Sequence, residues 1–178
     1  MIEYDTIDSS FFRENKKYIE SIKQELNALN IVWLGSCSGF GYDVEAEFER
    51  NGLNFYLRFI KYQTTQNGII KPINANEYTG INISVTGFDY RYKLEVSKSL
   101  LQRCLCSKRI KMKIPKPYFL KFSNTVNDGT IDTLAKVLIK NEISKIQIED
   151  KRCSVVIHKA VTTPLELVDD IAYIINRL

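Results

Sequence analysis

The sequence predicts an α+β fold: a mostly antiparallel sheet with an N-terminal helix, an internal helix and a C-terminal helix packed on one face. Strand-like segments follow one another in runs joined by short turns, whereas a parallel α/β sheet would alternate them with helices. Helix-like segments with a single apolar stripe occur at the start, in the last third and at the end of the chain. Such a helix buries its stripe against a sheet.

The composition is typical of one globular domain that spans residues 1–178. Hydrophobic residues make up 44% of the chain and charged residues 26%. No apolar run reaches the roughly 20 residues of a membrane-spanning helix. The polar, acidic start, MIEYDTIDSS, lacks the basic and apolar regions of a signal peptide. We therefore expect a soluble cytoplasmic protein with no transmembrane segment; the sequence leaves its oligomeric state open.

The N-terminal segment, residues 9–29, predicts a helix. Its apolar residues fall on one face at helical spacing, and its charged residues fill the opposite face. Three residues at its start are suited to accept hydrogen bonds from the first free backbone N–H groups: Asp8, Ser9 and Ser10. A short apolar strand at 31–34 follows the helix and leads into a glycine-rich stretch at 35–41.

The clearest local signal is a hairpin after this stretch. Apolar and acidic residues alternate from 43 to 49, and apolar residues recur at every second position from 53 to 59. Between the two runs, Asn51 and Gly52 tolerate the positive φ angles of a tight turn. The alternation places the side chains at every second position of each strand on an apolar face and the remaining side chains on a polar face.

The middle third predicts a loop followed by short elements. Residues 63–80, rich in Asn, Thr and Gly, predict a long loop, and two interpretations are open: a short edge strand at 69–70 or a flexible functional loop. Alternation resumes at 81–96, with Gly87 as a candidate bulge. The remaining expectations are one or two helical turns at 97–105 capped by Ser97, a strand at 109–114 that Pro115 and Pro117 end, and a strand at 118–122.

The last third predicts a helix, a hairpin and a second helix. An apolar stripe indicates a helix over 128–141, with Thr130 as its cap. Residues 145–161 alternate around a central turn and predict the second hairpin. Thr163 and Glu166 have the spacing of a capping box, with a proline at the first helical position between them, so we expect the final helix to begin there.

The cysteines do not indicate a metal or redox site. Cys37 and Cys153 stand alone, and Cys104 and Cys106 form C-x-C, which is not the C-x-x-C of a zinc knuckle or a redox motif. With one histidine in the chain, a Cys/His zinc site has too few ligands at the usual spacings. We expect four reduced thiols, no metal and no cofactor.

The run GSCSG at residues 35–39 has the spacing of a nucleophile elbow, in which a sharp turn between a strand and a helix exposes the nucleophile. Cys37 with His158 downstream would then act in a thiol-dependent hydrolase or transferase. The alternation that follows the glycines argues against the required helix. We therefore interpret Gly35, Gly39 and Gly41 as positions where the chain passes close to a neighbouring strand; the Cys37–His158 enzyme remains the alternative.

The sequence contains two further candidate binding sites, one for phosphate and one for a divalent cation, and it supports both only weakly. The glycine stretch could offer backbone N–H groups to a phosphate, but neither G-K-[ST] nor G-x-G-x-x-G is present. Glu45, Glu47 and Glu49 would share one strand face and could bind a divalent cation. The solvated face of a half-buried sheet carries the same kind of row, and we expect that simpler role.

The distribution of charge is uneven. The chain carries a formal net charge of +4, yet no acidic residue occurs from 96 to 127, where eight residues are basic: Lys98, Arg103, Lys108, Arg109, Lys111, Lys113, Lys116 and Lys121. In a strand at 109–114, Lys111 and Lys113 would share one face. Such a surface suits an anionic partner, although an edge strand protected by lysines has the same composition.

From the sequence we therefore expect a non-enzymatic binding protein whose basic region, residues 98–121, contacts an acidic partner. The residues expected to bind are Lys108, Arg109, Lys111, Lys113, Lys116 and Lys121. A protein partner is favoured over nucleic acid or anionic lipid. The alternatives are the Cys37–His158 enzyme and small-molecule binding in a cavity between the sheet and the C-terminal helix.

Overall fold

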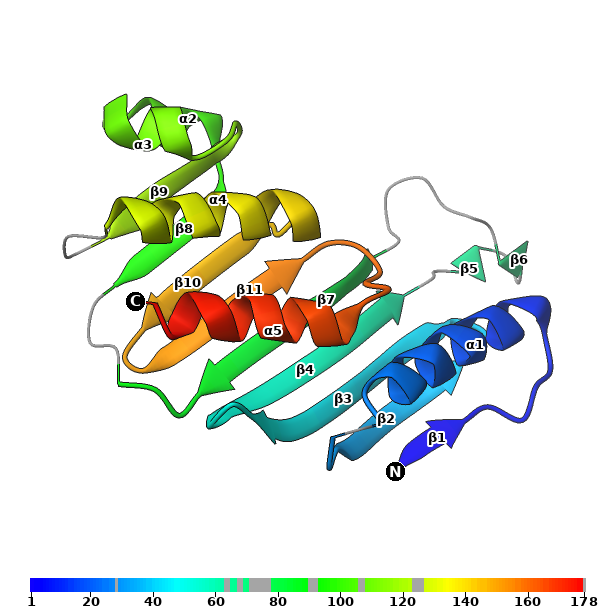
Figure 1. Ribbon diagram of the computed structural model, residues 1–178. Helices are drawn as coiled ribbons and strands as arrows, with labels where there is room; N and C mark the ends of the chain where they lie inside the picture. Colours follow the sequence, from blue (N-terminus) through cyan, green and yellow to red (C-terminus); the bar gives the residue numbers. More distant parts are fainter. Residues whose placement is uncertain are drawn as a thin grey trace.

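A computed structural model of the chain has a nine-stranded sheet with helices along one face (Figure 1). The structure describes residues 1–27, 29–62, 65–66, 69–70, 78–89, 93–105, 108–122 and 127–177, without the side chains of residues 65, 66, 69, 70, 100, 103, 108, 109 and 111. The α+β class and the three long helices predicted from the sequence are confirmed. Among the described residues, no helix has the length and apolar character needed to cross a membrane.

The secondary-structure elements account for most of the described chain. They are, in order, β1 (Ile2–Tyr4), α1 (Ser10–Glu25), β2 (Val32–Ser38), β3 (Gly41–Arg50), β4 (Leu53–Tyr62), β5 (Thr65–Gln66), β6 (Ile69–Ile70), β7 (Tyr78–Thr86), β8 (Leu94–Lys98), α2 (Leu100–Cys104), α3 (Lys108–Lys113), β9 (Tyr118–Phe122), α4 (Asp128–Asn141), β10 (Lys145–Glu149), β11 (Arg152–Ile157) and α5 (Pro164–Ile175).

The strands of the main sheet lie in the order β1-β2-β3-β4-β7-β11-β10-β8-β9. Every neighbouring pair is antiparallel except β1 and β2, which are parallel. β5 and β6 pair with each other as a separate two-stranded sheet. β7 is the middle strand of the nine, and the two halves of the sheet extend from it to the edges at β1 and β9.

The two predicted hairpins form around turns with positive φ angles. Asn51 and Gly52 have φ values of 55° and 74° between β3 and β4. Asp150 and Lys151 have φ values of 48° and 62° between β10 and β11. Two successive residues with positive φ are the signature of a type I′ turn, whose twist matches that of the flanking strands. Asn51-Gly52 is the dipeptide that this turn prefers, whereas Asp150-Lys151 adopts it without glycine.

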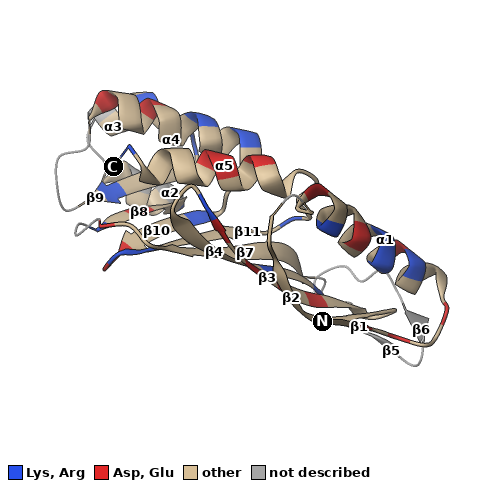
Figure 2. Ribbon diagram, turned by 60° about the horizontal axis from the view of Figure 1, so that its bottom comes forward, with Lys and Arg blue, Asp and Glu red and all other residues tan. Residues whose placement is uncertain are grey.

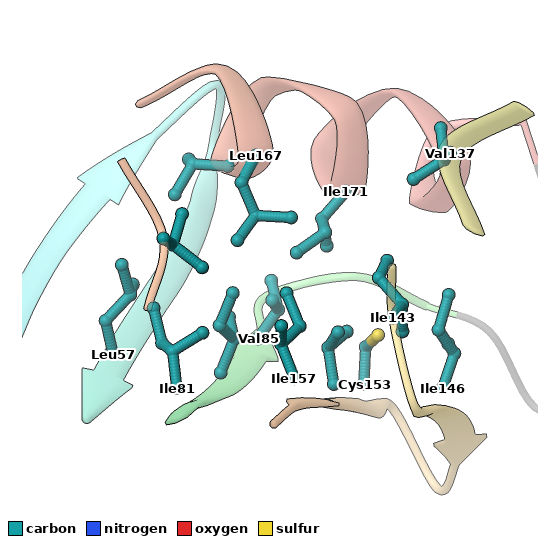
Figure 3. Close-up of a cluster of buried hydrophobic side chains, with 14 of the residues drawn as sticks. Leu57, Ile81, Val85, Val137, Ile143, Ile146, Cys153, Ile157, Leu167 and Ile171 are labelled. Carbon is teal, nitrogen blue, oxygen red and sulfur yellow. The ribbon is translucent and has the colours of Figure 1, made fainter. Parts of the chain in front are cut away.

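The hydrophobic core lies between one face of the sheet and the helices α1, α4 and α5 (Figure 2). Figure 3 shows Leu167 and Ile171 of α5 above Val85, Ile157 and Cys153 of the sheet. All five side chains are at most 1% exposed. The side chains at alternate positions of the strands point to the other face, which α1, α4 and α5 leave uncovered (Figure 2).

Polar contacts join α5 to β3, α4 and α1. Arg50, the last residue of β3, donates two hydrogen bonds to Asp169, at 2.6 and 2.9 Å. The next residue, Asp170, pairs with Lys140 of α4 at 2.7 Å. The predicted capping box at Thr163 is wrong, because Thr163 makes no side-chain cap. Glu25 of α1 instead accepts the backbone N–H of Leu165 at 3.1 Å, so a carboxylate from another helix satisfies the first turn.

Asn15 fastens α1 to the sheet, which the sequence did not indicate. Its side chain is 1% exposed. Its Nδ2 donates to the carbonyl of Ser38 at 2.9 Å, and its Oδ1 accepts from Lys61 Nζ at 3.0 Å. The amide thus has a partner on both of its polar atoms, as a buried polar group requires, and it joins α1 to β2 and β4.

The glycine-rich stretch belongs to the β2–β3 hairpin. β2 runs through Ser38, beyond the predicted end of the strand at 34, and Gly35 has a φ of 127° within it. A Cβ on Gly35 would lie 2.1 Å from the carbonyl oxygen of Asp43, and one on Gly41 would lie 1.8 Å from that of Lys61. The interpretation of these two glycines as points of close approach to a neighbouring strand is confirmed. Gly39 differs, because its Cβ would meet the Ser9 side chain at 3.1 Å.

The largest error concerns residues 109–114. The alternating sequence RIKMKI predicted a strand, but the chain forms the helix α3. Ile110 and Ile114 are buried, at helical spacing, while Met112 is 79% exposed. Lys111 and Lys113 therefore do not share a strand face. Apolar residues recur at every second position over these six residues, but burial of Ile110 together with Ile114, four residues later, favours the helix.

Smaller corrections concern two helix caps, one residue of α4 and the strand β1, whereas the short strand predicted at 69–70 is present as β6. Ser99, not Ser97, accepts the N–H of Gln102 at the start of α2. Asn127, not Thr130, caps α4, accepting the Thr130 N–H at 2.8 Å. Ile139 is exposed and not buried. The remaining differences are that β1 was not predicted, that Gly87 follows the end of β7 instead of forming a bulge, and that most of the 63–80 loop lies outside the described residues.

We expect Gly41→Ala to destabilise the protein by about 3 kcal/mol. Its φ of 141° is strained for alanine, and the added methyl group would push against the backbone of β4. The measurement is urea unfolding, with the midpoint lowered and the slope unchanged. Gly129→Ala is the control: the nearest atom to its Cβ is Asn127 Oδ1 at 3.4 Å, and no loss is expected. Equal stability of the two variants would contradict the close approach of β3 and β4.

Candidate binding surface

Cys37 is buried in β2 and does not stand on an elbow. Its side chain is 1% exposed, and its register partner is Tyr42 of β3. A second strand, not a helix, follows it. Burial raises the pKa of the Cys37 thiol to about 11, so the reactive thiolate is disfavoured at neutral pH.

His158 lies on a different part of the sheet. It is exposed just after β11 and meets the Tyr78 ring edge-on, with ring centroids 5.5 Å apart. β3, β4 and β7 separate β2 from β11, which corresponds to about 19 Å across the sheet. The structure therefore does not bring Cys37 and His158 together, and the geometry that the thiol alternative needs is not present among the described residues.

The acidic row of β3 lies on the uncovered face of the sheet, as the alternation predicted. Glu45, Glu47 and Glu49 point there with Asp43, opposite the buried Val44, Ala46 and Phe48. Arg58 of β4 donates to both carboxylate oxygens of Asp43, at 2.8 and 2.6 Å, and these hydrogen bonds lower the pKa of Asp43. Within the described residues, no group of three His, Cys, Asp or Glu side chains is arranged to hold a metal ion.

The predicted basic region is divided by the fold. Lys113 of α3 lies 2.8 Å from Asp132 and 3.6 Å from Asp128, so α4 neutralises its charge. Lys116 and Lys121 are exposed. Lys108, Arg109 and Lys111 belong to α3, but their side chains lie outside the described ones. Of the six predicted residues, the structure therefore supports two as exposed cations and assigns a third to an intramolecular pair.

Packed side chains fill the interior beneath α5, which is where the small-molecule alternative needs a cavity. Leu167, Val168 and Ile171 of the helix are at most 1% exposed, and Leu167 and Ile171 point toward the apolar side chains of the sheet (Figure 3). A small molecule would have to displace this packing, which is costly in a close-packed core.

A pocket instead opens at the β9 end of the sheet, with a volume of about 480 Å³. Its lining is contributed by β8, α2 and its following turn, α3 and β9: Glu95, Gln102, Leu105, Ile110, Phe119, Leu120, Lys121 and Phe122. Leu105 at its rim is 87% exposed, while Phe119 is 4% exposed. Such a volume and such a largely apolar lining are typical of binding pockets.

The sequence did contain a signal for this pocket. Phe119 pairs with Ser97 and Lys121 pairs with Glu95 across β8 and β9, so the aromatic ring occupies a position of the polar, uncovered face. A phenylalanine at such a position indicates that something covers it. Neither a family model, nor a curated protein, nor a solved structure matches the chain.

We expect thiol reagents to distinguish the cysteines of the folded protein. Cys104 is exposed, whereas Cys37 and Cys153 are buried, with pKa values raised by burial to about 11 and about 12. Iodoacetamide at pH 8 should label Cys104 within minutes and the other two only after unfolding, as mapped by mass spectrometry. Rapid labelling of Cys37 that follows a titration near neutral pH would contradict this description and restore the thiol enzyme.

Proposed function

We propose that this protein acts by binding, and that its partner is an acidic protein segment that carries an apolar side chain. The pocket at the β9 end is the observation that supports the proposal. It combines an apolar floor at Phe119 with an exposed lysine, Lys121, at its rim. The same end of the molecule contains the basic region, including Lys116.

The two parts of this surface would contribute in different ways. An apolar side chain that leaves water for the pocket contributes about 2 kcal/mol. Exposed lysines contribute less affinity each but increase the rate of association and select acidic partners. Affinity would thus come from the anchor, and selectivity from the charge.

Glu95 determines where the acidic groups of the partner can lie. It is the cross-strand neighbour of Lys121 and lines the same pocket. A carboxylate deep in the pocket would be repelled by Glu95, whereas one at the rim would meet Lys121. The apolar side chain is therefore expected inside and the acidic groups outside.

The proposal predicts binding of model peptides. An alternating Glu–Leu peptide should bind more tightly than poly-L-glutamate of the same charge, and binding of both should weaken as salt is added. Lys116→Glu together with Lys121→Glu should lower the affinity for both peptides about tenfold. Leu105→Ser should lower the affinity for the Glu–Leu peptide alone. Isothermal titration calorimetry at low protein concentration measures each case.

The matched control carries the same change in charge elsewhere. Lys17 on α1 and Lys136 on α4 are exposed, and changing both to glutamate should leave peptide binding within about twofold, because long-range charge is screened in salt. If the control loses as much affinity as the Lys116 and Lys121 variant, binding reflects net charge and the proposed surface is wrong. Binding of heparin or single-stranded DNA in preference to both peptides would favour a nucleic-acid partner instead.

A further inference from the structure

The uncovered face of the sheet separates its charges by strand. β3 presents Asp43, Glu45, Glu47 and Glu49, with one basic neighbour, Arg58, on β4. The strands beyond the centre present Lys145 on β10, Arg152 on β11 and Lys121 on β9, with acidic groups at Glu95 and Glu149. One half of the face is thus strongly acidic, and the other carries the free basic side chains.

Several of these charges have no ion-pair partner among the described residues. Among the described residues, Glu47 and Glu49 on the acidic half have no ion-pair partner, and neither do Lys145 and Arg152 on the basic half. Others are engaged within the chain: Asp43 and Glu45 lie next to Arg58, and Glu149 next to Lys93. The unpaired charges remain available to another molecule.

The middle of the face is suited to close approach by another sheet. β7 contributes Asn82, Ser84 and Thr86 there, and β11 contributes Ser154. These side chains are small and uncharged. Near one edge, Val32 and Leu34 of β2 are exposed by 60% and 50%, and at the other edge the apolar pocket opens.

We infer that the uncovered face binds a second copy of this chain, sheet against sheet, about a twofold axis parallel to β7. This inference rests on the proposed function: the apolar side chains that the pocket at the β9 end would recognise are those of β2 of the other copy, while the acidic β3 beside it lies over β10. An interface with twofold symmetry uses the same patch on both copies, so each contact occurs twice.

The strand register makes the two halves complementary. β7 is the fifth of nine strands, so a twofold axis along it lays β3 of one copy over β10 of the other and β2 over β8. Glu45, Arg58, Asn82, Val156 and Lys145 form one cross-strand row with Asn82 in the middle. The axis therefore places Glu45 of one copy opposite Lys145 of the other. Face-to-face sheets pack about 10 Å apart with strands within about 30° of parallel, close enough for such side chains to meet.

The same axis matches the apolar features at the two edges. Glu95 of β8 and Val32 of β2 belong to one row, each three strands from β7 on opposite sides. Since Glu95 lines the pocket, Val32 of one copy lies over the pocket of the other. Val32 thus meets the pocket of the other copy beside Glu95, and Glu45 meets Lys145, without any change in the fold. In the same register Glu47 lies opposite the uncharged Gln147.

Charge reversal tests this arrangement. One variant carries Glu45→Lys and Glu47→Lys, and a second carries Lys145→Glu and Arg152→Glu. Sedimentation equilibrium should show a dimer for the unaltered protein. Each variant alone should have a dimer dissociation constant raised about 100-fold, because like charges then meet twice in each interface. An equimolar mixture should dimerise again, because each interface then has one native and one reversed set of opposite charges.

The control variant, Lys17→Glu with Lys136→Glu on the helices, should dimerise like the unaltered protein. Circular dichroism confirms that each variant is folded, and recovery in the mixture cannot come from misfolded chains. A monomer for the unaltered protein at millimolar concentration would overturn the inference, as would a dimer that both reversals leave intact. Peptide binding at the β9 end is measured separately. A monomer that still binds the Glu–Leu peptide would overturn the inference of a second copy and leave the proposed function standing.

Discussion

Along the central strands, apolar and polar residues alternate so that the apolar side chains of all the strands point to the same face of the sheet. The rest of the structure depends on this constraint. The register pairs apolar residues with apolar residues across the sheet, as in Ala46 with Leu57, Leu57 with Ile83 and Ile83 with Val155. A shift by one residue in any of these strands would turn its apolar side chains to water. One face must then be covered, and α1, α4 and α5 cover it from three separate parts of the chain (Figure 1).

Local features maintain that register. Turns with two positive φ angles fix the β3–β4 and β10–β11 hairpins, and Gly35 and Gly41 allow backbone contacts that a side chain would prevent. Asn15 then joins α1 to the same region through Ser38 and Lys61. Backbone geometry thus sets the pairing, and buried polar contacts join the helix layer to the sheet.

The parts that the sequence predicted correctly are those determined by local residues, such as the Asn51-Gly52 hairpin and the apolar stripe of α5. The errors occur where contacts between residues far apart in the sequence determine the structure. Residues 109–114 alternate like a strand, but burial of Ile110 and Ile114 at helical spacing favours the helix α3. β1 is three residues long and pairs in parallel with β2, so no turn signal marks it. The pocket needs α2 and β9 together; within residues 98–121 the sequence indicated its charge and, through Phe119 on the face of Lys121, an apolar position that needs cover, but not the helix that supplies it.

The separation of charge on the uncovered face is not needed for folding. Opposite charges on neighbouring strands stabilise a sheet by about 0.2–1 kcal/mol per pair, so folding alone would favour acidic and basic residues side by side. Glu45 follows that rule with Arg58, whereas Glu47 pairs in register with Val32 and Tyr56, and Lys145 with Val156 and Ser97. These charges therefore add little to the stability of the single chain. Because they lie four strands apart, on opposite sides of the central strand, they are about 19 Å from one another and do not pair within one chain.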